Sequence, residues 1–80
     1  MPKLPRVSAS EVIHALEKLG FIKVRQKGSH VILKKSTTIE GTTIVIGCVV
    51  PLHNKTIAVG TLSNILNQAQ ISAEDLIDNL

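Results

Sequence analysis

Residues 43–50 form an almost unbroken run of β-branched and apolar side chains, interrupted only by Gly47. Such side chains favour the extended backbone of a sheet. The run is too short to span a membrane, which takes about 20 apolar residues in a helix. Pro51 follows, and proline lacks the N–H that a strand ladder uses. The run therefore predicts a buried strand that ends at Pro51, in which Gly47 indicates a bulge or close packing.

A helix is predicted ahead of this strand. Ser8 can cap its first turn, and Glu11 lies three residues later, as in a capping box. Gly20 is free to adopt the left-handed conformation that stops a helix, and Phe21 can fold back on Leu16 in a Schellman ending. An apolar stripe recurs between them at helical spacing, formed by Val12, Ile13, Leu16 and Leu19.

A β-hairpin is predicted to follow, because apolar and basic residues alternate from Ile22 onward. If Lys27-Gly28 forms a two-residue turn, Arg25 pairs with His30 and Val24 pairs with Val31. The core face of the hairpin would then comprise Ile22, Val24, Val31 and Leu33, and the opposite face would carry Lys23, Arg25 and His30.

The remaining segments complete an α+β fold. Residues 36–42 are predicted as a polar loop that turns at Glu40-Gly41, and a second helix is predicted at about residues 59–69. Ser72 and Asp75 predict a short third helix with its own capping box. The apolar faces of these two helices would be Leu62, Ile65, Leu66 and Ala69, and Leu76, Ile77 and Leu80. This order predicts a three-stranded antiparallel sheet with helices on one face and His30 on the other.

The length of 80 residues predicts a single domain over residues 1–80, with residues 1–6 flexible. Its charge is unevenly distributed. Five basic and no acidic residues occur from Lys23 to Lys35, whereas the last ten residues carry three acidic ones. A one-sided positive surface attracts nucleic acid or an acidic partner. A merely solvated strand face is the alternative interpretation.

His30 is the candidate catalytic residue. Histidine transfers protons near neutral pH, and RNA offers a 2′-hydroxyl to deprotonate beside a phosphodiester whose charge a cation can stabilise. No acidic cluster is present to hold Mg²⁺, so no metal and no cofactor are expected. A surface histidine that simply follows a turn is the alternative. The candidate RNA- and phosphate-binding residues are Lys23, Arg25, Lys27, Gly28, Ser29, Lys34 and Lys55.

The other reactive side chains are weaker candidates. His53 could be a second acid or base, a phosphate contact, or neither, and His14 lies opposite the apolar stripe of its helix. The three histidines do not have metal-ligand spacing. Cys48 is alone, so we expect a small core residue, no disulfide and a reducing cytoplasmic setting. Phe21 is the only aromatic residue, which favours phosphate contacts over base stacking.

Four sequence blocks occur in an order that resembles the HicA toxin family, the small mRNA interferases of type II toxin–antitoxin pairs. They are residues 11–21 (EVIHALEKLGF), 24–33 (VRQKGSHVIL), 50–55 (VPLHNK) and 60–72 (GTLSNILNQAQIS). The resemblance implies a fold like that of double-stranded-RNA-binding domains, cleavage of mRNA with His30 as catalyst, and inhibition by a HicB antitoxin bound over the active face. The chain departs from the family pattern at Val31, Leu33 and Gln70, where many relatives have histidine, an aromatic residue and glycine.

Two other functions remain open at the level of sequence. One is a non-catalytic RNA-binding module that uses the same basic hairpin. The other is a decayed toxin that acts through protein–protein contacts. Neither a secretory signal nor a membrane segment is recognisable, so a cytoplasmic protein without a membrane partner is expected.

Overall fold

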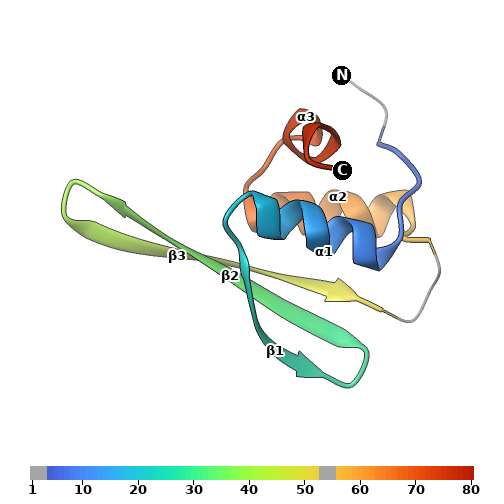
Figure 1. Cartoon of the computed structure of the whole chain (residues 1–80), viewed down its shortest axis with the longest axis horizontal. Coiled ribbons are helices and arrows are strands. Elements are labelled where there is room, and N and C mark those ends of the chain that lie inside the picture. The colour runs from blue at the N-terminus through green and yellow to red at the C-terminus, as the bar shows by residue number, and fades with distance from the viewer. Residues whose placement is uncertain (1–3, 53–55) are drawn as a thin grey trace.

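The computed structural model describes residues 4–52 and 56–80. Its elements are α1 (Ala9–Lys18), β1 (Ile22–Lys27), β2 (His30–Ile39), β3 (Thr42–Pro51), α2 (Val59–Ala69) and α3 (Ala73–Asp78). The strands form one antiparallel sheet in the order β1-β2-β3. Figure 1 shows α1 and α2 on the same side of this sheet, with α3 on the far side of the two helices. The predicted α+β architecture is confirmed.

The helix ends match the signals in the sequence. Ser8 caps α1 and Ser72 caps α3, each in a reciprocal capping box. Gly20 ends α1 with a φ of 102°, and the Phe21 N–H donates to the Leu16 carbonyl over 3.0 Å. This is the predicted Schellman ending. No helix in the described part of the chain is long and apolar enough to cross a membrane.

The core lies between the two long helices and one half of the sheet. Its fully buried large side chains come from α1, β2, β3, α2 and α3: Val12, Leu16, Val31, Leu33, Val50, Leu62, Ile65 and Leu76. The predicted apolar face of α2 is buried throughout. For α3 the prediction was only partly correct, because Ile77 and Leu80 are exposed. Since α3 packs on the outer side of the helices, only one of its apolar positions, Leu76, is buried.

The predicted hairpin turn was wrong by one residue, so the predicted pairing beside it was wrong by two residues: His30 lies opposite Lys27 and not opposite Arg25. The turn residues are Gly28 and Ser29, so Lys27 pairs with His30 and Arg25 with Ile32. A bulge between Lys23 and Arg25 then shifts the rest of β1. The apolar residues of β1, Ile22 and Val24, are consequently exposed rather than buried against the helices.

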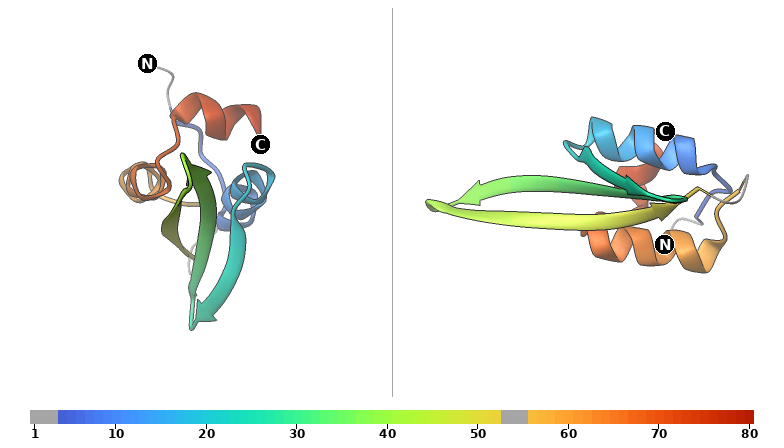
Figure 2. Two further views of the ribbon diagram at one scale, coloured as in Figure 1. Left: turned by 90° about the vertical axis from the view of Figure 1, so that its left-hand side faces the viewer. Right: turned by 90° about the horizontal axis from the view of Figure 1, so that it is seen from below.

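The region predicted as a loop at residues 36–42 is mostly strand. Pairing of β2 with β3 continues to Ile39↔Thr42, and only Glu40 and Gly41 form the turn, both with positive φ. Thr37, Thr38 and Ile39 are β-branched and favour an extended backbone, so the strand continues although the helices do not cover it. The 10 residues of α1 span about 15 Å, whereas the 10 residues of β2 span about 33 Å. We call the uncovered part, residues 36–45, the hairpin arm; it projects past the helices in Figures 1 and 2.

The third strand is therefore buried over only part of its length, contrary to the prediction. Cys48 and Val50 are buried under the helices, whereas Ile44 and Val45 on the arm are exposed. The register of β2 with β3 runs without a break past Gly47, so no bulge occurs there. A Cβ added at Gly47 would meet its nearest neighbours at 3.7 Å, which is ordinary contact and not unusually close packing.

Candidate functional site

His30 lies at the first position of β2, on the sheet face that points away from the helices. Its neighbour in sequence, Val31, is buried among the helices, and His30 itself is exposed. Successive side chains of a strand point to opposite faces, so His30 belongs to the open face, as predicted. Across the sheet its partners are Lys27 on β1 and Pro51 on β3.

Three cations share this face with His30. Lys27 is its direct cross-strand neighbour, and side chains directly opposite each other lie on the same face. Arg25 pairs with Ile32, two positions along β2, and Lys34 follows two positions later. All four side chains are exposed. We call His30, Lys27, Arg25 and Lys34 the open-face cluster.

The bulge in β1 removes Lys23 from this cluster, contrary to the predicted arrangement. Lys23 pairs with Leu33, which is fully buried on the helix side of the sheet. An extra residue in one strand of a pair moves the side chains beyond it to the opposite face of the sheet. The turn at Gly28-Ser29, and not the bulge, sets Lys27 beside His30, in the place that the expected register assigned to Arg25.

A sequence signal for the observed turn was available in Gly28-Ser29. Of these two residues only Gly28 has a positive φ, 59°, the pattern of a type II′ hairpin with glycine first. Two hydrogen bonds organise the tip. The Gln26 side-chain amide donates to the Gly28 carbonyl over 3.2 Å, and the Leu52 N–H donates to the Ser29 carbonyl over 2.6 Å.

The second of these hydrogen bonds ties the end of β3 to the hairpin tip. It brings Leu52 beside Ser29, one residue from His30. Two candidates from the sequence, His53 and Lys55, lie outside the described residues. Their predicted roles stay predictions.

Lys35 and Phe21 lie on the helix side of the sheet. The Lys35 ammonium is 5.9 Å from the centre of the Phe21 ring, in cation–π geometry. Phe21 is buried. The one aromatic ring of the chain is therefore packed in the core and is not presented on the open face for base stacking.

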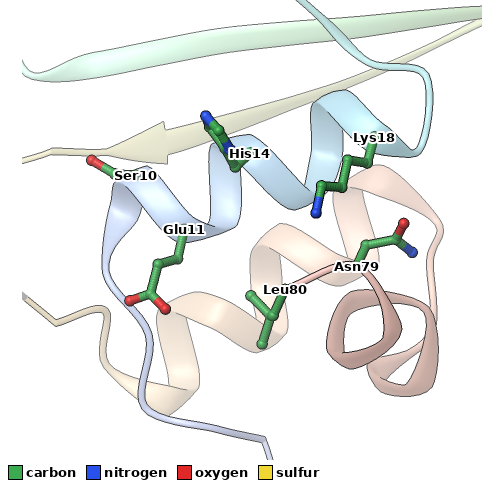
Figure 3. Close-up of a pocket in the computed structure, with 6 residues that line it drawn as sticks. All are labelled: Ser10, Glu11, His14, Lys18, Asn79 and Leu80. Atoms are coloured by element: carbon green, nitrogen blue, oxygen red, sulfur yellow. The ribbon is translucent and has the colours of Figure 1, made fainter.

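The remaining reactive groups lie away from the open-face cluster. Cys48 is buried, and burial raises the pKa of its thiol from 9.0 to about 11, so it behaves as the predicted core residue. His14 is exposed on α1 and lines a shallow pocket at the chain end with Ser10, Glu11, Lys18, Asn79 and Leu80 (Figure 3). Within residues 4–52 and 56–80, no three His, Cys, Asp or Glu side chains are grouped as a metal site.

The fold and this face define a small α+β protein with an open basic sheet surface that carries one histidine. A family model described as the HicA toxin of bacterial toxin–antitoxin systems matches residues 9–71. The match extends from the start of α1 to just past α2 and includes the whole open-face cluster. The chain belongs to the HicA toxin family. A search of curated proteins finds no match.

Proposed function

We propose that this protein is the toxin of a type II toxin–antitoxin pair and acts as a metal-independent endoribonuclease on mRNA. The observation that carries the proposal is the register that sets His30 directly opposite Lys27, with Arg25 on the same exposed face. Membership of the HicA toxin family supports it. The basic segment of residues 23–35 contains no carboxylate, so its electrostatics favour a polyanion.

The chemistry starts with proton transfer at the ribose. Neutral His30 accepts the proton of a 2′-hydroxyl, and the 2′-oxygen forms a bond to the adjacent phosphorus. The bond from phosphorus to the 5′-oxygen breaks, that oxygen takes a proton from water, and the proton held by His30 returns to the solvent. The products are a 2′,3′-cyclic phosphate and a 5′-hydroxyl. Both are formed from atoms of the RNA and from protons, and the reaction takes no atom from a metal ion or a bound cofactor.

The three cations of the cluster have a separate role. Lys27 lies next to the imidazole and can stabilise the charge that develops on the phosphoryl oxygens. Arg25 and Lys34 lie two and four positions from His30 along the same face, where they can bind neighbouring phosphates. The RNA contacts are thus mainly to the backbone, and we expect little sequence preference.

The protein partner in this proposal is a HicB-like antitoxin. It would inhibit the toxin by covering the open-face cluster, since RNA and antitoxin then compete for one surface. The support for this partner is the toxin–antitoxin family to which the chain belongs.

The decisive experiment compares purified wild type, His30→Ala and His14→Ala on a long single-stranded RNA in EDTA. His14 is a matched control because it is also an exposed histidine, on α1. We expect wild type and His14→Ala to cleave, and His30→Ala to lose at least about a hundredfold in rate, the scale of general acid–base catalysis. Circular dichroism would confirm that all three are folded.

Product ends and binding separate the alternatives. Cyclic phosphate and 5′-hydroxyl termini would agree with the mechanism above. Equal cleavage by wild type and His30→Ala would rule out the proposed role of His30. Tight, salt-sensitive RNA binding without cleavage in either protein would identify a non-catalytic RNA-binding module instead.

A further inference from the structure

The two edges of the sheet differ in their protection against pairing with another strand. The β1 edge carries three basic residues and a bulge, which are devices that prevent edge-to-edge association. The β3 edge carries no charge from Thr42 to Pro51 and pairs regularly with β2 over its whole length. An uncharged and regular edge strand is a template for β-pairing.

The backbone groups that face outward from β3 can be identified. The Val49 N–H donates to the Gln68 side chain of α2 over 3.1 Å, so it points away from β2. Pro51, two residues later, has no N–H and lies on the same edge. Because alternate residues of an antiparallel strand point the same way, Thr43, Val45 and Gly47 also direct their N–H and C=O groups outward.

The free stretch of this edge is short and has a definite centre. Gln68 covers the edge at Val49, and the right-hand view of Figure 2 shows α2 beside that end of β3 while the hairpin arm extends beyond it. The open positions are therefore residues 43–47. An antiparallel partner of identical sequence would use all of them in one register, with the two-fold axis at Val45.

That register places apolar side chains against each other on both faces. Val45, 57% exposed, would meet its own copy, and Ile44, 42% exposed, would lie opposite Ile46 of the second molecule. Cross-strand β-branched pairs stabilise a sheet. The basic residues of the open-face cluster belong to β1 and β2, so no cation lies directly opposite another in the new strand pair.

We infer that the β3 edge is a self-association surface: two copies of this chain pair their β3 strands antiparallel about Val45 and form a continuous six-stranded sheet. The surface is distinct from the open-face cluster, and the inference does not depend on ribonuclease activity. An extended segment of another protein could use the same edge, but the apolar matches of Val45 with its own copy and of Ile44 with Ile46 favour a second copy.

Sedimentation velocity over a wide range of concentration tests the inference, using wild type, Val45→Lys and Val24→Lys. Val24 is the matched control, since it is a valine of similar exposure, 51%, on the opposite edge. Val45→Lys would place like charges face to face, so its dimer dissociation constant should rise by about tenfold or more. Val24→Lys should dimerise like wild type.

Cross-linking gives an independent measurement of the register. Directly paired residues have Cα atoms about 5.5 Å apart, within the range that a disulfide bridges. Val45→Cys should therefore form a covalent dimer when oxidised glutathione takes the two electrons and two protons from the thiols, whereas Val24→Cys should not. Native Cys48 is buried and does not interfere. A monomeric wild type at millimolar concentration, or equal behaviour of the two lysine variants, would overturn the inference.

Discussion

The face of the sheet to which a side chain points decides what that side chain can do in this protein. His30 and Cys48 both lie on the sheet, but His30 is exposed on the open face and Cys48 is 3% exposed under the helices. Burial raises the pKa of the Cys48 thiol to about 11, because the thiolate would lose its hydration. The same alternation buries Val31 and Leu33 in the core.

The raised pKa of Cys48 predicts a pH dependence of stability. The folded thiol keeps its proton between pH 9.0 and about 11, whereas the unfolded chain releases it. Protons are then bound more tightly by the folded state, so the free energy of unfolding falls as pH rises through this window and is unaffected below it. Urea denaturation should show that the free energy of unfolding of wild type falls by about 1–2 kcal/mol more than that of Cys48→Ala across this pH window. A difference between the two proteins that stays constant with pH would contradict this prediction.

At the scale of elements, α1 and α2 end in the same way with different residues. Gly20 follows α1 at φ 102°, and Gln70 follows α2 at φ 57°. In both, the next residue donates an N–H to the helix, from Phe21 to Leu16 and from Ile71 to Leu66. A left-handed residue at this position favours glycine, so Gln70 adopts this conformation at a cost in strain.

Replacing Gln70 with glycine should stabilise the protein. Glycine removes the strain of a left-handed side-chain-bearing residue, and its greater freedom in the unfolded chain offsets part of the gain. We expect Gln70→Gly to raise the free energy of unfolding by about 0.5 kcal/mol. Gly20→Ala should lower it by about 1 kcal/mol or more, also because its Cβ would lie 3.3 Å from the Lys35 side chain. Chemical denaturation measures both, and a destabilised Gln70→Gly would refute this account.

The whole molecule separates its charges across the layers of the fold. The open-face cluster lies on the sheet face away from the helices, whereas the acidic residues Glu74, Asp75 and Asp78 belong to α3, beyond the helices. The one-sided surface expected from the sequence is thus built by the layer order. Such a field orients the sheet toward a polyanion and turns α3 away from it.

This separation predicts which lysines contribute to RNA binding. The variants are compared in a His30→Ala background, which prevents cleavage. Lys27→Ala should reduce the slope of the logarithm of the RNA-binding constant against the logarithm of the salt concentration by about 0.7, because one lysine–phosphate contact releases about that many counterions from single-stranded RNA. Lys18→Ala on α1 makes the same change in net charge away from the open face and should leave the slope nearly unchanged. Fluorescence anisotropy at several salt concentrations measures both slopes, and equal effects would mean that net charge, not the open face, governs binding.

The amino-acid sequence by itself determined the helices and the class of fold. Capping boxes at Ser8 and Ser72, the stop at Gly20 and the apolar stripes act over a few residues, so local chemistry is enough to predict them. The position of His30 on the open face of the sheet followed from strand alternation alone. Only the tertiary structure decided the partner of His30, the position of Lys23 and the extent of the hairpin arm. Strand register and length depend on pairing between distant residues and on how far the helices cover the sheet, and neither quantity is contained in any short stretch of the chain.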